Sequence, residues 1–135
     1  HIPKGKKVKI RLSSRDVIHS FALPEMRVKQ DAIPGMEIPI YFTAIMSSDE
    51  YLEYLKKNDK VRYNNMLDKD QTTYDRFPKS DKDLFFRGYQ ISCAQLCGNS
   101  HYSMKGYMKV HEPDDFEDWL EEVETLFPLE EEEEW

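Results

Sequence analysis

The sequence has no long hydrophobic run and very little cysteine. Its uninterrupted apolar stretches are only a few residues long, far short of the roughly 20 residues that a membrane-spanning helix needs. Only 2 of its 135 residues are cysteine, which limits any disulfide to a single one. With 39% hydrophobic and 13% aromatic residues, the chain still has enough apolar material for the core of one domain. We therefore expect a soluble domain with no segment that crosses a bilayer.

The beginning of the chain lacks an initiator methionine and a signal-peptide pattern. It starts at His1 and continues directly into KGKKVKIRL, which already alternates like a β-strand. We interpret the sequence as a fragment of a longer protein.

The C-terminal part of the chain lacks positive charge. Residues 110–135 contain 13 acidic residues and no lysine or arginine, whereas residues 1–109 carry a net charge of +6. The overall charge of −7 therefore comes from the C-terminal segment. Five consecutive glutamates at 130–134 are typical of a solvated, disordered tail. We expect no nucleic-acid partner for this chain.

The hydrophobic pattern predicts mostly strands with helices inserted. Alternation at 8–12 and 38–42 predicts two half-buried strands, and a third, containing Phe85, Tyr89 and Ile91, leads to Cys93. A return strand is expected at 107–111.

Two helices and a long excursion are expected as well. Ser47 and Glu50 form a capping box before a short helix with Tyr51, Leu52 and Leu55 on one face. Residues 58–83 are polar and aperiodic, which indicates a long surface excursion. Pro113 begins a final helix with an apolar stripe that ends before Pro128: Phe116, Trp119, Leu120, Val123 and Phe127. The fold class expected is all-β, a small sandwich or Greek-key barrel.

Residues 93–104, CAQLCGNSHYSM, contain both cysteines together with a histidine and a methionine. Gly98 and the strands expected on either side place the segment in a loop, where ligands can converge on one point. Thiolate, imidazole and thioether together favour copper, as in electron-transfer copper sites. Structural zinc has little use for methionine.

Other interpretations of this segment remain open at this point. Two cysteines in an extracytoplasmic protein commonly form a disulfide, and a Cys–His pair can serve nucleophilic catalysis. No acid or amide is placed to orient the histidine for catalysis, and the second cysteine would then have no role. Met104 alone would more often fill a core. We expect His1 and His111 on the surface.

Three stretches together resemble the CuA domain of cytochrome c oxidase subunit II. They are the string Cys93-x3-Cys97-x3-His101-x2-Met104, the segment DVIHSF at 16–21, and the segment KQDAIPG at 29–35. The resemblance covers residues 1 to about 44 and about 88 to 111, and implies a cupredoxin fold with a binuclear copper centre. It implies that His19 and His101 each bind one copper ion, that Cys93 and Cys97 bridge both, and that Met104 and the backbone carbonyl of Gln95 are weak axial ligands.

The resemblance also implies a function and partners. Subunit II of the family accepts electrons from cytochrome c or another c-type haem, and passes them to the haem of subunit I on the extracytoplasmic, periplasmic face of the membrane. Asp16 matches an acidic position near the donor-facing surface, and the stretch containing Lys29 and Asp31 matches a part that faces subunit I. The membrane-anchoring segment and the aromatic-rich electron-entry segment of the family lie upstream of this chain.

Two departures and three alternatives accompany the resemblance. Gln95 stands where the family usually has a glutamate that helps bind magnesium at the subunit I boundary, which leaves that metal an open question, and Phe21 stands where tryptophan is common. The alternatives are the CuA domain of a nitrous-oxide reductase, a mononuclear copper carrier or chaperone, and a disulfide-stapled domain. The expected organisation is a cupredoxin domain at 1–111 with an insertion at about 45–86, a C-terminal helix at 112–127 and an acidic tail at 128–135.

Overall fold

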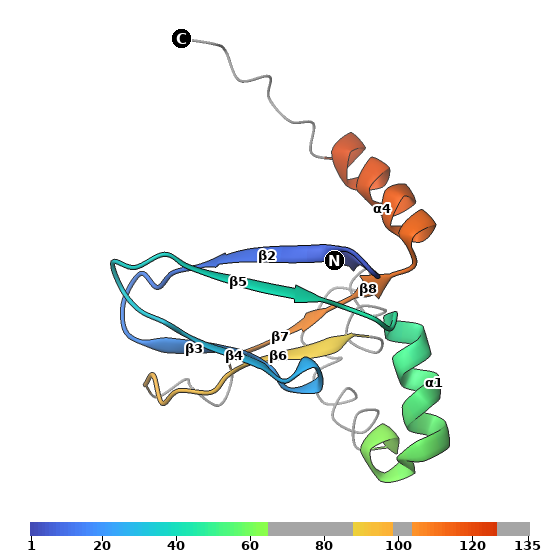
Figure 1. The fold of residues 1–135 in the computed structure, drawn as a ribbon, viewed down its shortest axis with the longest axis horizontal. Helices are drawn as coiled ribbons and strands as arrows, with labels where there is room; N and C mark the ends of the chain where they lie inside the picture. The colour runs from blue at the N-terminus through green and yellow to red at the C-terminus, as the bar shows by residue number, and fades with distance from the viewer. Residues whose placement is uncertain (65–87, 99–103, 127–135) are drawn as a thin grey trace.

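Two facing layers of β-strands form the body of the protein (Figure 1). The computed structural model describes residues 1–64, 88–98 and 104–126. One layer pairs β2 (Lys7–Leu12) with β5 (Ile38–Thr43). The other layer is a four-stranded sheet in the order β4-β3-β6-β7. Its strands are β3 (His19–Leu23), β4 (Val28–Ala32), β6 (Tyr89–Cys93) and β7 (Lys105–Met108). A short parallel pair, β1 (Ile2–Pro3) and β8 (Val110–His111), joins at one end. The predicted all-β sandwich is confirmed.

The β2–β5 pair follows directly from the alternation in the sequence. The antiparallel register sets Val8 opposite Phe42, Ile10 opposite Ile40 and Leu12 opposite Ile38. These residues are buried or half-buried while the lysines and arginine between them are exposed. Apolar side chains on one face of each strand therefore pack toward the second layer.

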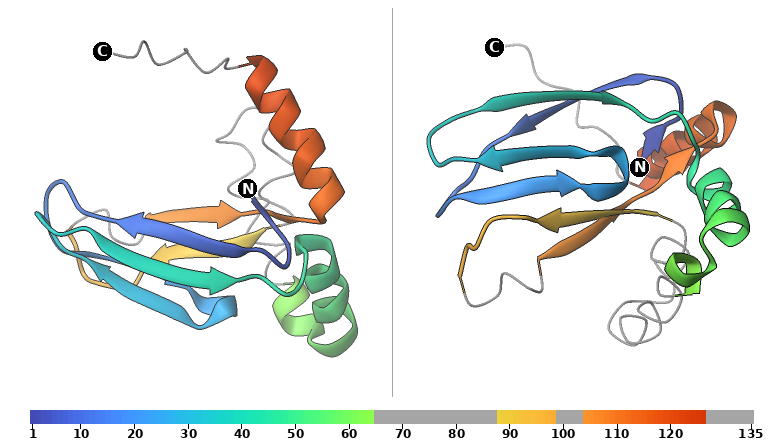
Figure 2. Two further views of the ribbon diagram at one scale, coloured as in Figure 1. Left: turned by 45° about the horizontal axis from the view of Figure 1, so that its top comes forward. Right: turned by 60° about the horizontal axis from the view of Figure 1, so that its bottom comes forward.

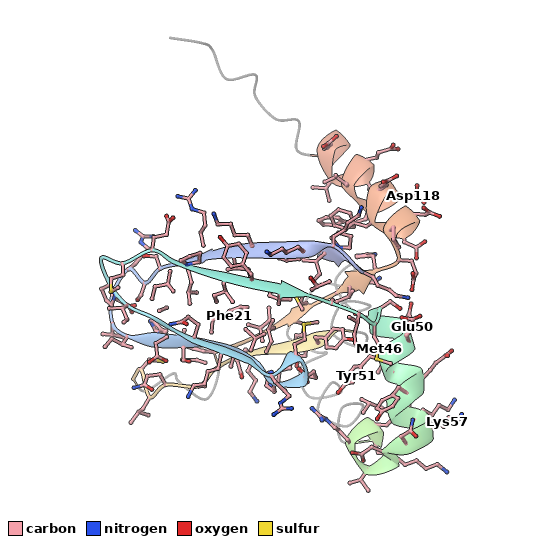
Figure 3. The ribbon with its side chains drawn as sticks, in the orientation of Figure 1. Phe21, Met46, Glu50, Tyr51, Lys57 and Asp118 are labelled. Atoms are coloured by element: carbon pink, nitrogen blue, oxygen red, sulfur yellow. The ribbon has the colours of Figure 1, made fainter. Side chains whose placement is uncertain are left out.

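Strand β3 is internal to the four-stranded sheet, between β4 and β6, and the sequence pattern did not predict it. Burial alternates from His19 to Ala22, but apolar and polar residue types do not, because the buried positions are Ser20 and Ala22 and the next residue, Leu23, is buried as well. A strand that lies between two other strands and is covered on its inner face is mostly buried, so its sequence need not alternate between apolar and polar residues. The pairing of β3 with β6 sets Phe21 opposite Cys93, and Figure 3 shows Phe21 between the two layers.

The core is concentrated toward the end of the sandwich where the helices lie. Leu23 is fully buried, and the cluster around it joins strand residues to α1 (Ser48–Asn58) through Tyr51 and Leu55. In Figure 3, Tyr51 reaches from α1 toward the strands while Lys57 points away. This packing closes one end of the sandwich and leaves the opposite end to the loops.

Helix α1 begins as the capping box predicted. The Ser47 hydroxyl accepts a hydrogen bond from the Glu50 N–H at 3.3 Å, and the Glu50 carboxylate accepts one from the Ser47 N–H at 2.8 Å. The polar run after it differs from the prediction, because the backbone is helical again at 60–64. There Asp59 accepts a hydrogen bond from the Arg62 N–H, which satisfies a donor at a helix start. The rest of the predicted excursion lies outside the described residues.

Helix α4 (Pro113–Leu126) is the predicted C-terminal helix. Most of it extends away from the sandwich (Figure 2). Its apolar residues Phe116, Trp119 and Val123 are half-buried and Leu120 is exposed. Phe127 and the acidic tail lie outside the described residues. Among the described helices, none is both long and apolar enough to span a membrane.

The prediction that His1 and His111 lie on the surface is wrong for His111. The residue is 8% exposed, and its Nε2 atom lies 2.6 Å from Nδ1 of His1. His1 in turn stacks on Trp119 with ring centroids 4.1 Å apart. The parallel pairing of β1 with β8 brings these rings together, a long-range contact between residues 110 positions apart that no local pattern reveals.

Candidate metal centre

The candidate metal centre lies at the end of the sandwich opposite the helices. Three chain segments meet there: the start of β3 at His19, the end of β6 at Cys93, and the residue before β7, Met104. The β3–β6 and β6–β7 pairings bring these segments side by side. The backbone N–H of Cys93 also donates to the Met104 carbonyl at 3.2 Å, which continues the β6–β7 ladder to the site.

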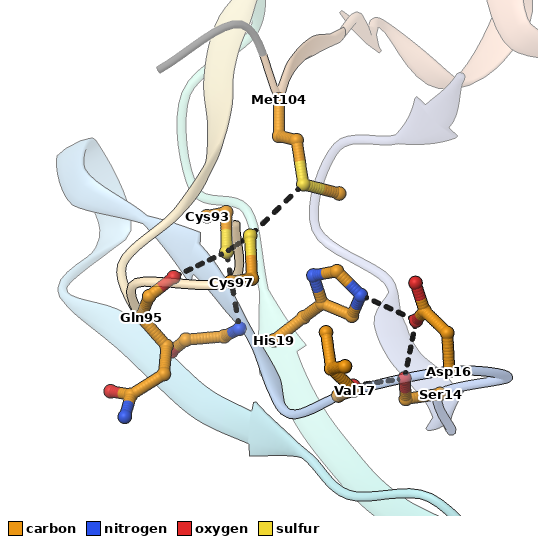
Figure 4. A network of polar contacts seen from close by, with 9 residues as sticks. Ser14, Asp16, Val17, His19, Cys93, Gln95, Cys97 and Met104 are labelled. Carbon is orange, nitrogen blue, oxygen red and sulfur yellow. Dashed lines mark hydrogen bonds and ion pairs between the residues drawn. The ribbon is translucent and has the colours of Figure 1, made fainter. Parts of the chain in front are cut away.

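The sulfur and nitrogen atoms of His19, Cys93 and Cys97 all lie within 4.8 Å of one another. The two Sγ atoms are 3.5 Å apart, and the Met104 Sδ lies 3.2 Å from the Cys97 Sγ. The Gln95 carbonyl oxygen is 3.2 Å from the Cys93 Sγ (Figure 4). No disulfide joins Cys93 and Cys97. The structure thus brings His19, which is far from the two cysteines in sequence, next to them.

The two ring nitrogens of His19 have different surroundings. Nε2 lies 2.7 Å from Oδ1 of Asp16, while Nδ1 is buried and has no hydrogen-bond partner within the described part of the chain. The hydrogen bond with Asp16, and then the nearby Cys93 sulfur, raise the pKa of His19. The same bond with His19 lowers the pKa of Asp16.

The two thiols differ in acidity. Burial alone would raise the pKa of Cys93, but backbone hydrogen bonds with Ser20 and Gln95, and then the neighbouring side chains of Cys97 and His19, lower it to about 6. Loss of water and the neighbouring Cys93 raise the pKa of Cys97. The thiolate is the form that binds metal, so the fold favours that form at Cys93 before any ion arrives.

An apolar cavity of about 360 Å³ adjoins the site. Its lining includes His19, Cys93 and Met104 together with the apolar side chains of Leu12, Phe21, Ala32 and Ile91. Apolar walls beside candidate sulfur ligands lower the local dielectric, which is one of the ways a protein tunes a metal's redox potential.

The other predicted residues fall in three places. His101 lies outside the described residues. Lys29 and Asp31 lie on β4, where they pair with Ala22 and Ser20 and take no part in the cluster. Asp16 is 70% exposed and contacts His19.

Sequence reasoning missed the part played by Ser20. Its backbone N–H approaches the Cys93 Sγ at 3.5 Å, and its side chain is 2% exposed. The only signal in the sequence was that Ser20 directly follows a candidate ligand, His19. The contact itself depends on the register between β3 and β6, which the sequence pattern did not predict.

The donor set fits copper better than the other common metals. Two thiolates, an imidazole and a thioether are soft or borderline ligands, the set that selects copper over magnesium or calcium. The buried Nδ1 atom facing the two sulfurs supplies the nitrogen donor without any rearrangement of hydrogen bonds.

Comparison with known proteins agrees with this fold. Residues 1–54 match the family described as cytochrome c oxidase subunit II, periplasmic domain. The chain is 33% identical over 126 residues to cytochrome c oxidase subunit 2 of Thermostichus vulcanus, covering 93% of this chain and 26% of that one. It is 30% identical over 129 residues to the alternative cytochrome c oxidase subunit 2 of Bradyrhizobium diazoefficiens, covering 96% of this chain and 32% of that one. The chain thus spans about a quarter to a third of these relatives.

Two solved structures share the fold. One is the periplasmic domain of cytochrome oxidase subunit II from Bradyrhizobium japonicum, with a TM-score of 0.60 and 25% identity over 93% of this chain and 63% of that one. The other is a mixed-disulfide intermediate between a thioredoxin-like protein and subunit II of cytochrome c oxidase, with a TM-score of 0.56 and 24% identity over 93% of this chain and 61% of that one. The predicted extracytoplasmic location agrees with the periplasmic domain named by the family. The chain belongs to the cytochrome c oxidase subunit II family and corresponds to its periplasmic domain.

Proposed function

We propose that this chain is the electron-entry domain of a cytochrome c oxidase and holds a binuclear copper centre. The observation that supports this most directly is the convergence of His19, Cys93 and Cys97, with the buried Nδ1 atom of His19 facing the sulfurs. When bound, the copper pair supplies a redox centre that takes up and releases one electron at a time.

The distances between these atoms support the ligand roles that we propose. Cys93 and Cys97, with Sγ atoms 3.5 Å apart, are near enough to share two metal ions as bridging thiolates. Met104 and the Gln95 carbonyl, each 3.2 Å from one of these sulfurs, would complete the centre as weak axial ligands. His101, together with His19, would provide the nitrogen ligands, one for each copper.

The surrounding chain favours fast electron transfer by holding the ligands in place. His19 and Cys93 belong to paired strands, and the Cys93 sulfur accepts a backbone hydrogen bond from Ser20. Ligands that are already fixed, beside an apolar cavity, leave little rearrangement of protein or water to accompany a change of charge.

The partners proposed are those of the family. Oxidase subunit I would receive the electrons, with Lys29 and Asp31 on the side that faces it, and cytochrome c or another c-type haem would donate them near Asp16. Membrane attachment would come from segments outside this chain. Gln95 carries an amide where the family's magnesium ligand is a carboxylate, so the magnesium ion is not included in this proposal.

The number of copper ions per chain and the electron paramagnetic resonance spectrum distinguish the proposed function from its alternatives. The family match and the relatives are oxidase subunits, which favours the oxidase over a nitrous-oxide reductase. A mononuclear carrier would bind one copper ion per chain. A disulfide-stapled domain would bind none.

An electron paramagnetic resonance spectrum after anaerobic copper loading tests the proposal. We expect two copper ions per chain and a hyperfine pattern from one unpaired electron shared by two copper nuclei. In Cys97→Ser one bridging sulfur is lost, and we expect a pattern from a single copper. A single-copper pattern in the unaltered protein would reject the binuclear centre.

The thiol state provides a second check. Hydrogen peroxide would oxidise Cys93 and Cys97 to one disulfide, with two electrons and two protons transferred to the peroxide to form two molecules of water. We expect the oxidised protein to bind no copper at this site, and dithiothreitol to restore binding. Copper binding that survives complete loss of both thiols would contradict the ligand assignment.

A further inference from the structure

The contact between Asp16 and His19 gives the histidine ring a defined orientation. Asp16 Oδ1 lies 2.7 Å from Nε2, on the side of the ring away from the cysteines (Figure 4). The opposite ring nitrogen, Nδ1, is buried among the candidate copper ligands. The ring is therefore held between a carboxylate on one side and two sulfurs on the other.

An ionised carboxylate accepts hydrogen bonds and cannot donate them. A neutral His19 ring that keeps this contact must carry its hydrogen on Nε2, and its lone pair is then on Nδ1. The lone pair points toward the position where a metal would sit. In a neutral imidazole the partner of one nitrogen decides which tautomer is present, and so which nitrogen can bind metal.

Asp16 is held by hydrogen bonds within a loop and not by burial. It lies between β2 and β3 with its side chain 70% exposed. The Ser14 hydroxyl is 3.3 Å from the same Oδ1 atom and also contacts the Val17 carbonyl. Ser14 itself forms a bridge with Pro34, so a second loop fixes the position of this one. The carboxylate consequently has a defined place although it faces solvent.

We propose that Asp16 is a positioning residue for the copper ligand His19, fixing the ring so that Nδ1 is the atom presented to the metal. This inference rests on the proposed copper function and goes beyond it, because the sequence had assigned Asp16 only to the donor-facing surface. A carboxylate bonded to a ligating histidine increases the basicity of that ligand. Asp16 therefore strengthens the His19–metal bond and favours the oxidised, more highly charged state of the centre.

The two roles of Asp16 make different predictions. A charge that only attracts the electron donor would change the donor's association rate and its salt dependence. A positioning residue would change the tautomer of His19 in the metal-free protein, and the copper affinity and reduction potential in the loaded protein. These last three properties involve no donor at all.

The test compares Asp16→Ala and Asp16→Asn with the unaltered protein. Asparagine keeps a neutral acceptor at the same place, so it should rescue part of the effect. Glu37→Ala is the matched control, because it removes an exposed carboxylate that pairs with Arg11. The reduced, metal-free proteins are examined by nitrogen-15 NMR of His19 at alkaline pH, where the ring is neutral. The loaded proteins are examined by copper titration and potentiometry.

We expect one His19 tautomer, with hydrogen on Nε2, in the unaltered protein and in Glu37→Ala, and a mixture of tautomers in Asp16→Ala. Copper affinity in Asp16→Ala should fall by about 10–100-fold, as for other partners of metal-bound histidines, and the reduction potential should rise, with Asp16→Asn between the two. Unchanged tautomer, affinity and potential in Asp16→Ala would overturn the proposal. If no protein binds copper while the tautomer still depends on Asp16, the copper function fails and the positioning role stands.

Discussion

Met104 occupies an unusual place for a methionine, because its sulfur lies beside a cysteine and its side chain is 41% exposed. A methionine that only filled the core would be buried. In copper sites a weak axial thioether tunes the reduction potential more than it determines whether the metal binds. The exposure and the 3.2 Å contact with Cys97 together support the axial role proposed for it.

Met104→Leu tests this role at the scale of one residue. We expect two copper ions per chain to remain, since the bridging thiolates are intact. The potential should rise, because an apolar group replaces a donor that stabilises the oxidised centre. Met36→Leu, at an exposed position on the loop before β5, is the control. Potentiometry of both variants makes the comparison, and equal potentials would show that Met104 is not a ligand.

Residue by residue, the candidate donors could be named from the sequence, whereas the groups around them could not. Residue type and spacing single out Cys93, Cys97 and Met104, and His19 was named through the resemblance of its segment to a known family. The Ser20 N–H bond to Cys93 could not, because any residue provides a backbone N–H and only strand register brings it to the sulfur. The Asp16–His19 contact had a weak signal in its three-residue spacing.

Among the secondary-structure elements, α1 and β8 share a buried hydrogen bond at the end of the sandwich away from the metal centre. The Ser48 hydroxyl accepts from the Val110 N–H at 2.9 Å, and both residues are 2% exposed. Lys4 adds ion pairs with Glu50 of α1 and with Glu112, just before α4. These exposed pairs contribute little to stability, so the buried bond is the stronger link between helix and sheet.

Ser48→Ala should destabilise the fold by about 1–3 kcal/mol, because it leaves the buried Val110 N–H without an acceptor. Glu53→Gln, on the exposed side of the same helix, should change the free energy of unfolding by less than about 0.5 kcal/mol. Urea unfolding of the two variants measures the difference. A loss in Ser48→Ala no larger than in Glu53→Gln would mean that the hydrogen bond carries no net stability.

His111, at the end of β8, packs against Phe116 and Trp119 of α4, so its charge state affects the stability of this contact. Burial, and then the charge of Lys109, lower the pKa of His111 below its ordinary 6.5. In the unfolded chain the ring takes up a proton near pH 6.5, whereas in the folded protein it resists protonation until a lower pH. The unfolded state therefore binds more protons in this window, and stability falls as the pH decreases below 6.5.

His111→Gln should remove part of this acid sensitivity. The groups near His111 are His1, Lys109, Asp49 and Asp115, and they stay in place in the variant. Urea unfolding above and below pH 6.5 should show a smaller loss of stability in His111→Gln than in the unaltered protein. An equal loss would assign the acid sensitivity to other groups.

Some strands and helices could be predicted from the sequence, and others could not. The strands at 7–12 and 38–43 and the helices α1 and α4 could be predicted, because alternation, caps and apolar stripes are local properties. Strands β3 and β4 were missed. In β3 three of five residues are buried, and in β4 exposed and half-buried residues mix without a clear period. Their position depends on which strands lie beside them, which is not a local property.

At the scale of the whole molecule, the metal centre and the acidic helix lie at opposite ends. Figures 1 and 2 show the start of β3 and the end of β6 at one end of the sandwich and α4 at the other. The carboxylates of α4 therefore lie away from the candidate metal centre, and salt screens the attraction of exposed charges for a distant donor.

This arrangement predicts which charges control the reaction with a donor. Neutralising three exposed carboxylates of α4 by Glu117→Gln, Glu121→Gln and Glu124→Gln should leave the rate of copper reduction by reduced cytochrome c nearly unchanged in stopped-flow measurements. Lys105→Gln, beside Met104 at the start of β7, should change it, raising the rate with a basic cytochrome and lowering it with an acidic one. The triple variant removes three charges and Lys105→Gln removes one, so the two are compared per charge removed. An effect per charge in the α4 variant as large as that of Lys105→Gln would show that the donor approaches from the helical end, and electron entry would then have to be reassigned to that side of the molecule.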